Sequence, residues 1–177
     1  MSLRIVAGEW GGRRLVAPPG RATRPTSDRV REALFSILGP LEGERVLDLF
    51  AGSGALGLEA LSRGAASATL VERAPSALRA LRANVEALGA SADVVAGDAR
   101  SFLRSAREQS AEYSLVFLDP PYRAASGLGR DLELEPVLAA GARVVAESDR
   151  RSPLDLSLPV TDERRYGDTL IRIHTLP

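Results

Sequence analysis

Hydrophobic and polar positions follow two different periods along most of the chain. From residue 45, short apolar runs predict buried strands, and stretches in which apolar side chains recur every three or four positions predict helices. The expected strands are residues 45–50, 67–72, 92–97, 113–118 and 142–148, and the expected helices are residues 55–64, 75–89, 99–109 and 131–140. Strands and helices therefore alternate, which is the order expected of a parallel sheet with helical crossovers.

The two ends of the chain add smaller elements to this pattern. Residues 3–17 contain two β-prone runs around a Gly-Gly pair and predict a β-hairpin, and a helix is expected at about 27–38. Residues 163–177 read as a strand, a Gly-Asp turn and a second strand. We therefore expect a Rossmann-like, doubly wound α/β sheet that is mostly parallel with an antiparallel C-terminal edge. The hairpin, within residues 1–20, is expected to extend a main domain at residues 21–177.

The composition limits the chemistry that these elements can support. With 45% hydrophobic and 26% charged residues among 177, the chain has the composition of a soluble globular protein. It has no cysteine and only one histidine, His174, and all 23 basic residues are arginine. Disulfides, thiolate metal sites and lysine chemistry are excluded, and neither a Ser-His-Asp triad nor a metal is expected. No apolar run approaches ~18 residues and no secretion signal is evident, so we expect a cytoplasmic protein without a membrane segment.

The charges are unevenly distributed although the formal net charge is zero. Residues 1–31 contain seven arginines and two acids, a net charge of +5, and the rest of the chain carries sixteen arginines and twenty-one acids, a net charge of −5. A basic segment on an acidic body indicates an anionic partner near the N-terminus. An ordinary solvated surface is the alternative interpretation.

Residues 48–57, DLFAGSGALG, form the predicted turn between the strand at 45–50 and its helix. Gly52, Gly54 and Gly57 match the pattern G-x-G-x-x-G, in which glycines let the backbone approach a ligand and the helix start presents free N–H groups. This match alone fits either a nicotinamide dinucleotide or S-adenosylmethionine.

Acids that follow the first three strands distinguish between these ligands. Glu72, eighteen residues after Gly54, can accept the ribose hydroxyls of either one. Asp48 would repel a pyrophosphate but suits the ammonium and sulfonium of S-adenosylmethionine, and Asp98 suits the adenine amino group. Helix capping is the alternative role for Asp48 and Asp98. The predicted cofactor-binding residues are Asp48, Phe50, Ala51, Gly52, Ser53, Gly54, Glu72, Arg73, Asp98 and Ala99.

Asp119-Pro120-Pro121-Tyr122 closes the strand at 113–118 and is the predicted catalytic motif. The lone pair of an exocyclic base amine is delocalised, so methyl transfer needs acceptors that hold the N–H bonds. The Asp119 carboxylate and the Pro120 carbonyl can supply them, while the prolines fix φ near about −65°. Tyr122 offers a face for a splayed-out base, worth ~1–3 kcal/mol. A proline-stiffened surface loop is the alternative.

These motifs resemble those of a known enzyme family. DLFAGSGALG followed by DPPY is similar to class I S-adenosylmethionine-dependent amino-methyltransferases, which act on adenine N6, cytosine N4, guanine N2 or a glutamine amide. The stretches RIVAGEWGGRRL, RPTSDRVREALFSIL and LDLFAGSGALGLEALSRGA, in this order, resemble the RsmD-type family of bacterial 16S ribosomal RNA guanine-N2 methyltransferases. The similarity covers nearly the whole chain and is weakest at about residues 124–165.

The resemblance implies methylation of guanine 966 of 16S RNA, in an assembled or assembling small ribosomal subunit, by a chain that we expect to be monomeric. It also implies that the hairpin at 3–17 helps to engage RNA and that residues 24–32 pack near the cofactor and the target base. Arginines there would contact phosphates, and Trp10 would stack on a base or pack on the body. The predicted RNA contacts are Arg4, Trp10, Arg13, Arg14, Arg24, Thr26 and Arg29.

Other functions remain open at this point. An adenine-N6 or cytosine-N4 methyltransferase on RNA or DNA shares the DPPY motif, although no DNA target-recognition region is evident in 177 residues. A nicotinamide-dependent dehydrogenase fits the glycine pattern but leaves Asp48 and DPPY unexplained. A non-catalytic RNA-binding module that keeps the fold is the third alternative.

Overall fold

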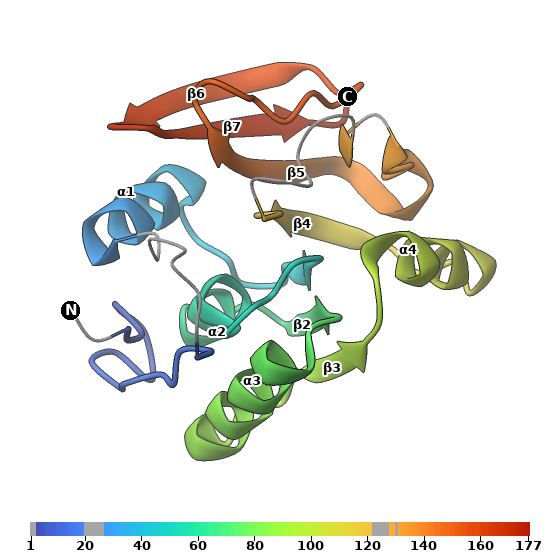
Figure 1. The fold of residues 1–177 in the computed structure, drawn as a ribbon. Helices are drawn as coiled ribbons and strands as arrows, with labels where there is room; N and C mark the ends of the chain where they lie inside the picture. The colour runs from blue at the N-terminus through green and yellow to red at the C-terminus, as the bar shows by residue number, and fades with distance from the viewer. Residues whose placement is uncertain (1–2, 20–26, 122–127, 130) are drawn as a thin grey trace.

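The computed structural model describes residues 3–19, 27–121, 128–129 and 131–177 (Figure 1), and the predicted site residues Arg24, Thr26 and Tyr122 lie outside them. Seven strands within the described residues form one sheet in the order β3-β2-β1-β4-β5-β7-β6. The strands are β1 (Arg45–Asp48), β2 (Ser67–Glu72), β3 (Asp93–Ala96), β4 (Tyr113–Leu118), β5 (Leu138–Asp149), β6 (Val160–Tyr166) and β7 (Thr169–Thr175). The helices are α1 (Asp28–Leu38), α2 (Ala55–Ser62), α3 (Pro75–Leu88) and α4 (Ala99–Glu108), with the 3₁₀ turn η2 (Glu135–Val137). None of the helices in these ranges is long and apolar enough to span a membrane.

The strand pairing confirms the predicted sheet. Strands β3, β2, β1, β4 and β5 pair in parallel, whereas β7 pairs antiparallel with both β5 and β6. Strands β2 and β3 extend the sheet on one side of β1, and β4 and β5 extend it on the other. The connections from β1 therefore run toward one edge of the sheet, and those from β4 run toward the other. Such a switch point between two neighbouring strands, here β1 and β4, leaves a crevice beyond their carboxyl ends.

Side chains of the central strands alternate between two core clusters, one on each face of the sheet. In β1, Val46 belongs to the cluster that includes side chains of α1, α2 and α3, and Leu47 belongs to the cluster that includes those of α4. Phe117 and Val116 repeat this alternation in β4. Figure 1 shows α1, α2 and α3 on one side of the sheet and α4 on the other. Burial on both faces explains why these strands are continuous apolar runs in the sequence.

The helix predicted at residues 131–140 is wrong. Within this stretch Asp131 alone is α-helical, the 3₁₀ turn η2 follows at Glu135–Val137, and β5 begins at Leu138. Leu132 and Leu134 are buried, whereas the acids that alternate with them, Asp131, Glu133 and Glu135, are exposed, which is the period of two of an extended chain. Pro136 also lacks the N–H that a helix interior requires. The alternation in DLELE was the signal for an extended segment.

The N-terminal segment turns back on itself as predicted, but it does not form a regular two-stranded ribbon. Contacts with the rest of the protein hold it in place. Within the described residues, its strand pairing is the single bridge between Arg4 and Arg14. Glu59 of α2 is fully buried and accepts two backbone N–H groups of the hairpin at 2.7 and 3.0 Å. Ile5 and Leu15 join the core cluster of α1 and α2. Hydrogen bonds and apolar packing thus hold the hairpin in place.

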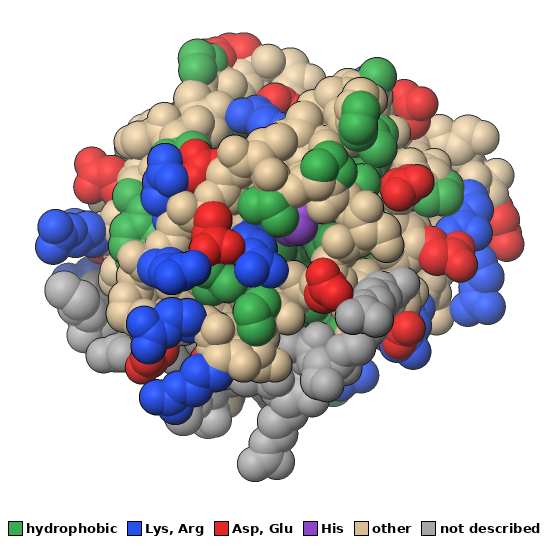
Figure 2. Space-filling view, turned by 90° about the horizontal axis from the view of Figure 1, so that it is seen from above, with side chains coloured by type: hydrophobic (Ala, Val, Ile, Leu, Met, Phe, Trp, Pro, Cys, Tyr) green, Lys and Arg blue, Asp and Glu red, His purple; other side chains and the backbone are tan. Residues whose placement is uncertain are grey.

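The surface over β6 and β7 carries charges of both signs. Figure 2 shows this face, with arginine side chains gathered toward one side and acidic side chains beside them. Arg164 pairs with Asp162, and Arg165 and Arg172 both pair with Glu163. The charge of this face is therefore largely balanced within itself, unlike that of the basic N-terminal segment.

Candidate functional site

The predicted acids after the first, second and fourth strands meet at one edge of the sheet. Asp48 is the last residue of β1 and pairs with Phe117 of β4, so Asp119 follows β4 two residues beyond this pair. Glu72 is the last residue of β2, which pairs with the opposite side of β1. The glycine turn and the Asp-Pro-Pro motif therefore lie at neighbouring strand ends, at the switch point of the sheet.

The glycine turn connects β1 to α2 and requires its glycines. Gly52 and Gly54 have φ values of 58° and 85°, which side chains rarely adopt. A Cβ atom on Gly54 would lie 2.5 Å from Leu81 Cδ1 of α3, and one on Gly57 would lie 2.2 Å from Leu70 Cδ2 of β2. The turn is therefore packed tightly between α3 and the sheet.

Glu72 is a buried acid whose carboxylate accepts hydrogen bonds from the backbone of the glycine turn and of the residues that follow β2. Its Oε2 accepts the Gly52 N–H at 2.9 Å, and its Oε1 accepts the N–H groups of Arg73 and Ala74 at 2.9 and 2.8 Å. A carboxylate offers about four acceptor positions, so about one remains for a ligand hydroxyl. Glu72 thus shapes the turn as well as facing the cavity beside it.

Asp48 is almost completely buried, at 1% exposure. Its Oδ2 accepts the Gly57 N–H at 3.3 Å, and its Oδ1 has no hydrogen-bond partner within the described residues. Burial raises the pKa of Asp48 to about 7, the backbone N–H groups of Gly57 and Phe50 offset part of that shift, and the nearby Glu72 adds to it. A buried carboxyl oxygen that lacks a partner in this part of the chain is the arrangement expected if its partner is a ligand.

A cavity of about 520 Å³ lies beside the turn, at the ends of β1, β2 and β3. The predicted residues Phe50, Glu72, Arg73, Asp98, Ala99 and Pro121 line it. Leu49, Ala74, Gly97, Arg100 and Leu128 also line it and were not predicted. The first four of these adjoin predicted residues in the sequence and could have been found by extending each motif, whereas no pattern marks Leu128. Residues of the predicted cofactor motifs and Pro121, which follows β4, therefore line the same cavity.

Asp98 is exposed and caps α4. Its Oδ1 accepts the N–H groups of Arg100 and Ser101, both at 3.1 Å. Hydrogen bonds from Ser101 lower the pKa of Asp98 below its ordinary value. Capping, the alternative role for this residue, is therefore present, and Asp98 lines the cavity at the same time.

The Asp-Pro-Pro motif leaves the sheet directly after β4. Asp119 is exposed, Pro120 is buried, and Pro121 is partly exposed and lines the cavity. The motif therefore lies at the edge of the sheet next to Asp48, where the chain leaves β4. The stacking role predicted for Tyr122 concerns a residue outside the described ranges.

The predicted RNA-binding residues have different surroundings. Arg4 pairs with Asp28 at 2.7 Å, and Arg13 donates to the carbonyl oxygen of Ala87 at 2.6 Å. Trp10 is partly buried against the core cluster of α1 and α2, which favours packing over stacking on RNA. Arg14 and Arg29 are exposed. Arg4 and Arg13 thus already have partners within the described part of the protein.

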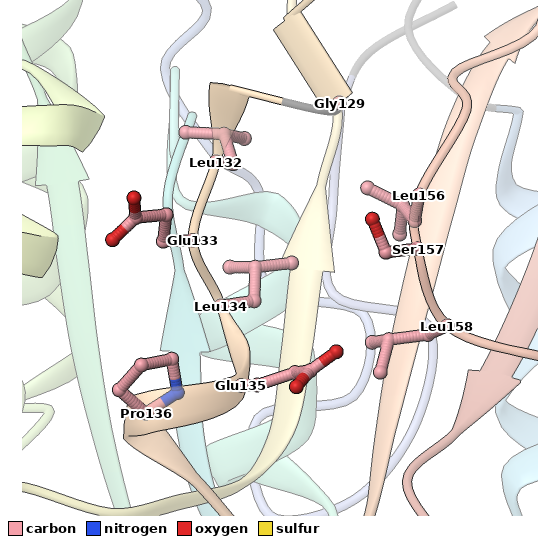
Figure 3. Close-up of a pocket in the computed structure, with 9 residues that line it drawn as sticks. All are labelled: Gly129, Leu132, Glu133, Leu134, Glu135, Pro136, Leu156, Ser157 and Leu158. Atoms are coloured by element: carbon pink, nitrogen blue, oxygen red, sulfur yellow. The ribbon is translucent and has the colours of Figure 1, made fainter.

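A second hollow, of about 270 Å³, is lined by Gly129 and residues 132–136 on one side and by the loop that leads into β6 on the other (Figure 3). Leucines dominate its lining, with Leu132 and Leu134 on one side and Leu156 and Leu158 on the other. It contains none of the predicted site residues, so it offers neither the strand-end acids nor the glycine turn that a cofactor site needs.

The fold and the site define a class I S-adenosylmethionine-dependent methyltransferase. A solved Thermus thermophilus 16S rRNA N2 G1207 methyltransferase, in complex with AdoMet and guanosine, has the same fold. Its TM-score is 0.71 at 22% identity, with 100% of this chain and 50% of that chain covered. Identity this low shows the fold alone.

The chain belongs to the family described as "Conserved hypothetical protein 95", whose model matches residues 3–175. A relative from Haemophilus influenzae, named "Ribosomal RNA small subunit methyltransferase D", is 37% identical over 162 residues, or 86% of this chain and 81% of the relative. A solved hypothetical protein of Thermus thermophilus is 35% identical with a TM-score of 0.84, covering 97% of this chain and 98% of that one. The resemblance to the RsmD-type family is therefore confirmed.

Proposed function

We propose that this protein transfers the methyl group of S-adenosylmethionine to the exocyclic N2 amine of a guanine in 16S ribosomal RNA of the small ribosomal subunit, the guanine 966 type. The observation that carries the proposal is the meeting of two motifs at adjacent strand ends. The glycine turn with Asp48 follows β1, and Asp119-Pro120 follows β4, its direct neighbour. A methyl donor and an acceptor amine have to meet in line, and neighbouring strand ends provide that proximity.

The cofactor half of the proposal assigns each part of S-adenosylmethionine to its own group of residues. The adenosine occupies the cavity of about 520 Å³, where Phe50 provides an apolar wall and Glu72 an acceptor for a ribose hydroxyl. The ammonium of the methionine part binds close to Asp48, whose buried carboxyl has one oxygen without a partner in the described part of the chain. The cation compensates the ionised carboxylate, which burial otherwise disfavours.

The catalytic half assigns Asp119 and the Pro120 carbonyl as acceptors for the two N–H bonds of the target amine. Holding these bonds keeps electron density on nitrogen while it changes from planar to tetrahedral. Bound S-adenosylmethionine would supply the methyl group: as the nitrogen takes it, the carbon–sulfur electron pair would return to sulfur, and the extra proton would pass from the amine to the Asp119 carboxylate or to water. Placement of the base next to the methyl group supplies much of the rate.

The choice of RNA and of guanine rests on family membership together with the charge distribution. The Haemophilus influenzae relative is named as a small-subunit ribosomal RNA methyltransferase. The first 31 residues carry a net charge of +5, and Arg14 and Arg29 are exposed within them. Exposed arginines on a basic segment suit contacts with phosphates, which position RNA without reading its sequence.

The catalytic assignment is tested by the substitution Asp119→Ala. We expect methyl transfer to fall about a hundredfold or more, because one acceptor at the reacting amine is lost. Affinity for S-adenosylmethionine, measured by calorimetry, should change little. Asp93→Ala makes the same chemical change at an exposed acid at the start of β3 and should leave activity intact. Undiminished methylation by Asp119→Ala would remove this residue from the mechanism.

The target is tested by mass mapping of 16S RNA from cells with and without the gene. We expect one N2-methylguanosine to be missing when the gene is deleted and to return with the wild-type gene but not with Asp119→Ala. Loss of a methylated adenine or cytosine instead would reassign the acceptor while keeping the class of enzyme. An unchanged set of methylated bases would contradict the proposed substrate.

A further inference from the structure

Asn84 is a buried amide on the core-facing side of α3, with 1% exposure. The three hydrogen bonds of its side chain all go to backbone atoms of segments distant in the sequence. Its Oδ1 accepts the Val16 N–H at 2.7 Å, and its Nδ2 donates to the Val16 carbonyl at 2.9 Å and to the Ser53 carbonyl at 2.8 Å. A single side chain therefore holds two segments that lie 31 and 68 residues away from it.

The two segments belong to different parts of the proposed enzyme. Val16 is in the N-terminal hairpin, and Ser53 is the central residue of the glycine turn, between Gly52 and Gly54. Figure 1 shows the hairpin beside α2 and α3. Among the described residues, no other side chain forms hydrogen bonds to both the hairpin and the turn. Asn84 is thus a direct link between the basic segment and the cofactor loop.

The packing around Asn84 makes this link stiff. The turn already lies against α3, because a Cβ on Gly54 would come within 2.5 Å of Leu81 Cδ1, one helical turn before Asn84. The paired bonds to the N–H and C=O of Val16 imitate the pairing of two strands. A shift of the hairpin breaks both of them and leaves the buried Oδ1 without its donor, so that only the bond to Ser53 remains, which is costly unless the amide moves. Any such movement of the amide stretches or breaks its hydrogen bond to the Ser53 carbonyl.

We propose that Asn84 is a positioning residue that couples engagement of RNA by the hairpin to binding of the cofactor at the glycine turn. This inference rests on the proposed function, in which the turn binds S-adenosylmethionine and the hairpin meets ribosomal RNA. RNA bound to the hairpin holds Val16 in place, which fixes the Asn84 amide and through it the Ser53 carbonyl. By linkage, the cofactor strengthens RNA binding by the same factor.

The test measures a coupling factor rather than activity. The affinity for S-adenosylhomocysteine, which cannot donate a methyl group, is determined with and without small ribosomal subunits from cells that lack the gene. For the wild-type protein we expect the subunits to raise this affinity about fivefold or more. In Asn84→Ala the ratio should fall to about one, even where the two separate affinities remain measurable.

Ser62→Ala is the matched control. Ser62 is also a buried polar side chain that fastens the hairpin to a helix, here α2. Its Oγ accepts the Trp10 N–H at 3.0 Å and donates to the Ala7 carbonyl at 2.6 Å. Both of these bonds go to the hairpin rather than to the glycine turn, so the variant should lose stability but keep the wild-type coupling factor. A purely structural role for Asn84 predicts the same behaviour for both variants.

Two results overturn the inference while leaving the proposed function intact. One is a wild-type coupling factor of one, and the other is an unchanged factor in Asn84→Ala. If the wild-type protein does not bind S-adenosylhomocysteine at all, the proposed function fails and the inference fails with it. Should Asn84→Ala not fold, Asn84→Ser takes its place, because a hydroxyl reaches either Val16 or Ser53 but cannot span both; it is expected to lose the coupling as well.

Discussion

At the scale of single residues, three acids at or just beyond the ends of strands have different roles in the fold. Asp48 is buried with a raised pKa, Glu72 accepts three backbone N–H groups, and Asp98 caps a helix with a lowered pKa. The sequence placed all three at the same edge of the sheet but made no distinction between their surroundings. That distinction depends on burial and on donors from other segments, such as the Gly57 N–H.

The raised pKa of Asp48 leads to a prediction about pH. Below about 7 the carboxyl is protonated and, in the proposed site, would not pair with the ammonium of the cofactor. Affinity for S-adenosylhomocysteine should therefore rise with pH, by up to about tenfold per unit, and level off above about 7. Calorimetry from mildly acidic to mildly alkaline pH measures the profile. The profile of Asp48→Asn should be flat, and a slope equal to that of the wild-type protein would exclude Asp48 as the titrating group.

The same group affects the stability of the free protein in the opposite sense. Because the folded state holds its proton more tightly than the unfolded state, the free energy of unfolding decreases as pH rises from about 4 to about 7. Urea unfolding across this range should show the decrease for the wild-type protein. The decrease should be smaller in Asp48→Asn, whose amide does not titrate.

At the scale of elements, the hairpin and the segment before β5 depend on contacts that sequence patterns do not reveal. The hairpin turn was predicted from its Gly-Gly pair, yet the hairpin is held by Glu59 and Ser62 of α2 and by Asn84 of α3. The segment at 131–140 was predicted as a helix, as part of the alternation of strands and helices along the chain. Its alternating burial and Pro136 favour an extended chain instead.

The docking of the hairpin on α2 is tested by two glycine substitutions with the same backbone strain. Gly8 and Gly12 both have a φ of 85°, but a Cβ on Gly8 would lie 1.8 Å from the Ser62 carbonyl oxygen, and one on Gly12 would meet nothing within 4 Å. Gly12→Ala should cost about 1 kcal/mol from its backbone alone. Gly8→Ala should cost a further ~1–3 kcal/mol because the hairpin has to shift. Equal losses in urea unfolding would mean that the hairpin is not tightly docked.

At the scale of the whole molecule, the strand order decides which motifs meet. β1 lies between β2 and β4, so the acids and turns that follow these three strands share one edge although they are spread over 72 residues. The alternation of strands and helices allowed this sheet to be predicted, because each apolar run is buried between two layers of helices or loops. The antiparallel β6–β7 edge followed from the Gly-Asp turn between two alternating runs.

Ligand specificity is a property of this whole arrangement and can be measured by thermal unfolding. A ligand present at about 100 times its dissociation constant stabilises the folded state by ~2.7 kcal/mol. For a domain of this size that raises the midpoint by roughly 5–10 °C. We expect such a shift with S-adenosylmethionine or S-adenosylhomocysteine and none with NAD. A shift with NAD alone would favour the dehydrogenase alternative.

The sequence by itself determined the sheet, the glycine turn and the position of the Asp-Pro-Pro motif, because these depend on the local period of apolar residues and on the limits that glycine and proline place on the backbone. Only the tertiary structure decided that Asn84 links the hairpin to the glycine turn, that Arg4 and Arg13 have partners within the protein, and that burial raises the pKa of Asp48 to about 7. Each of these depends on burial and on partners from distant parts of the chain. Such contacts form when the elements pack together, and no local pattern records them.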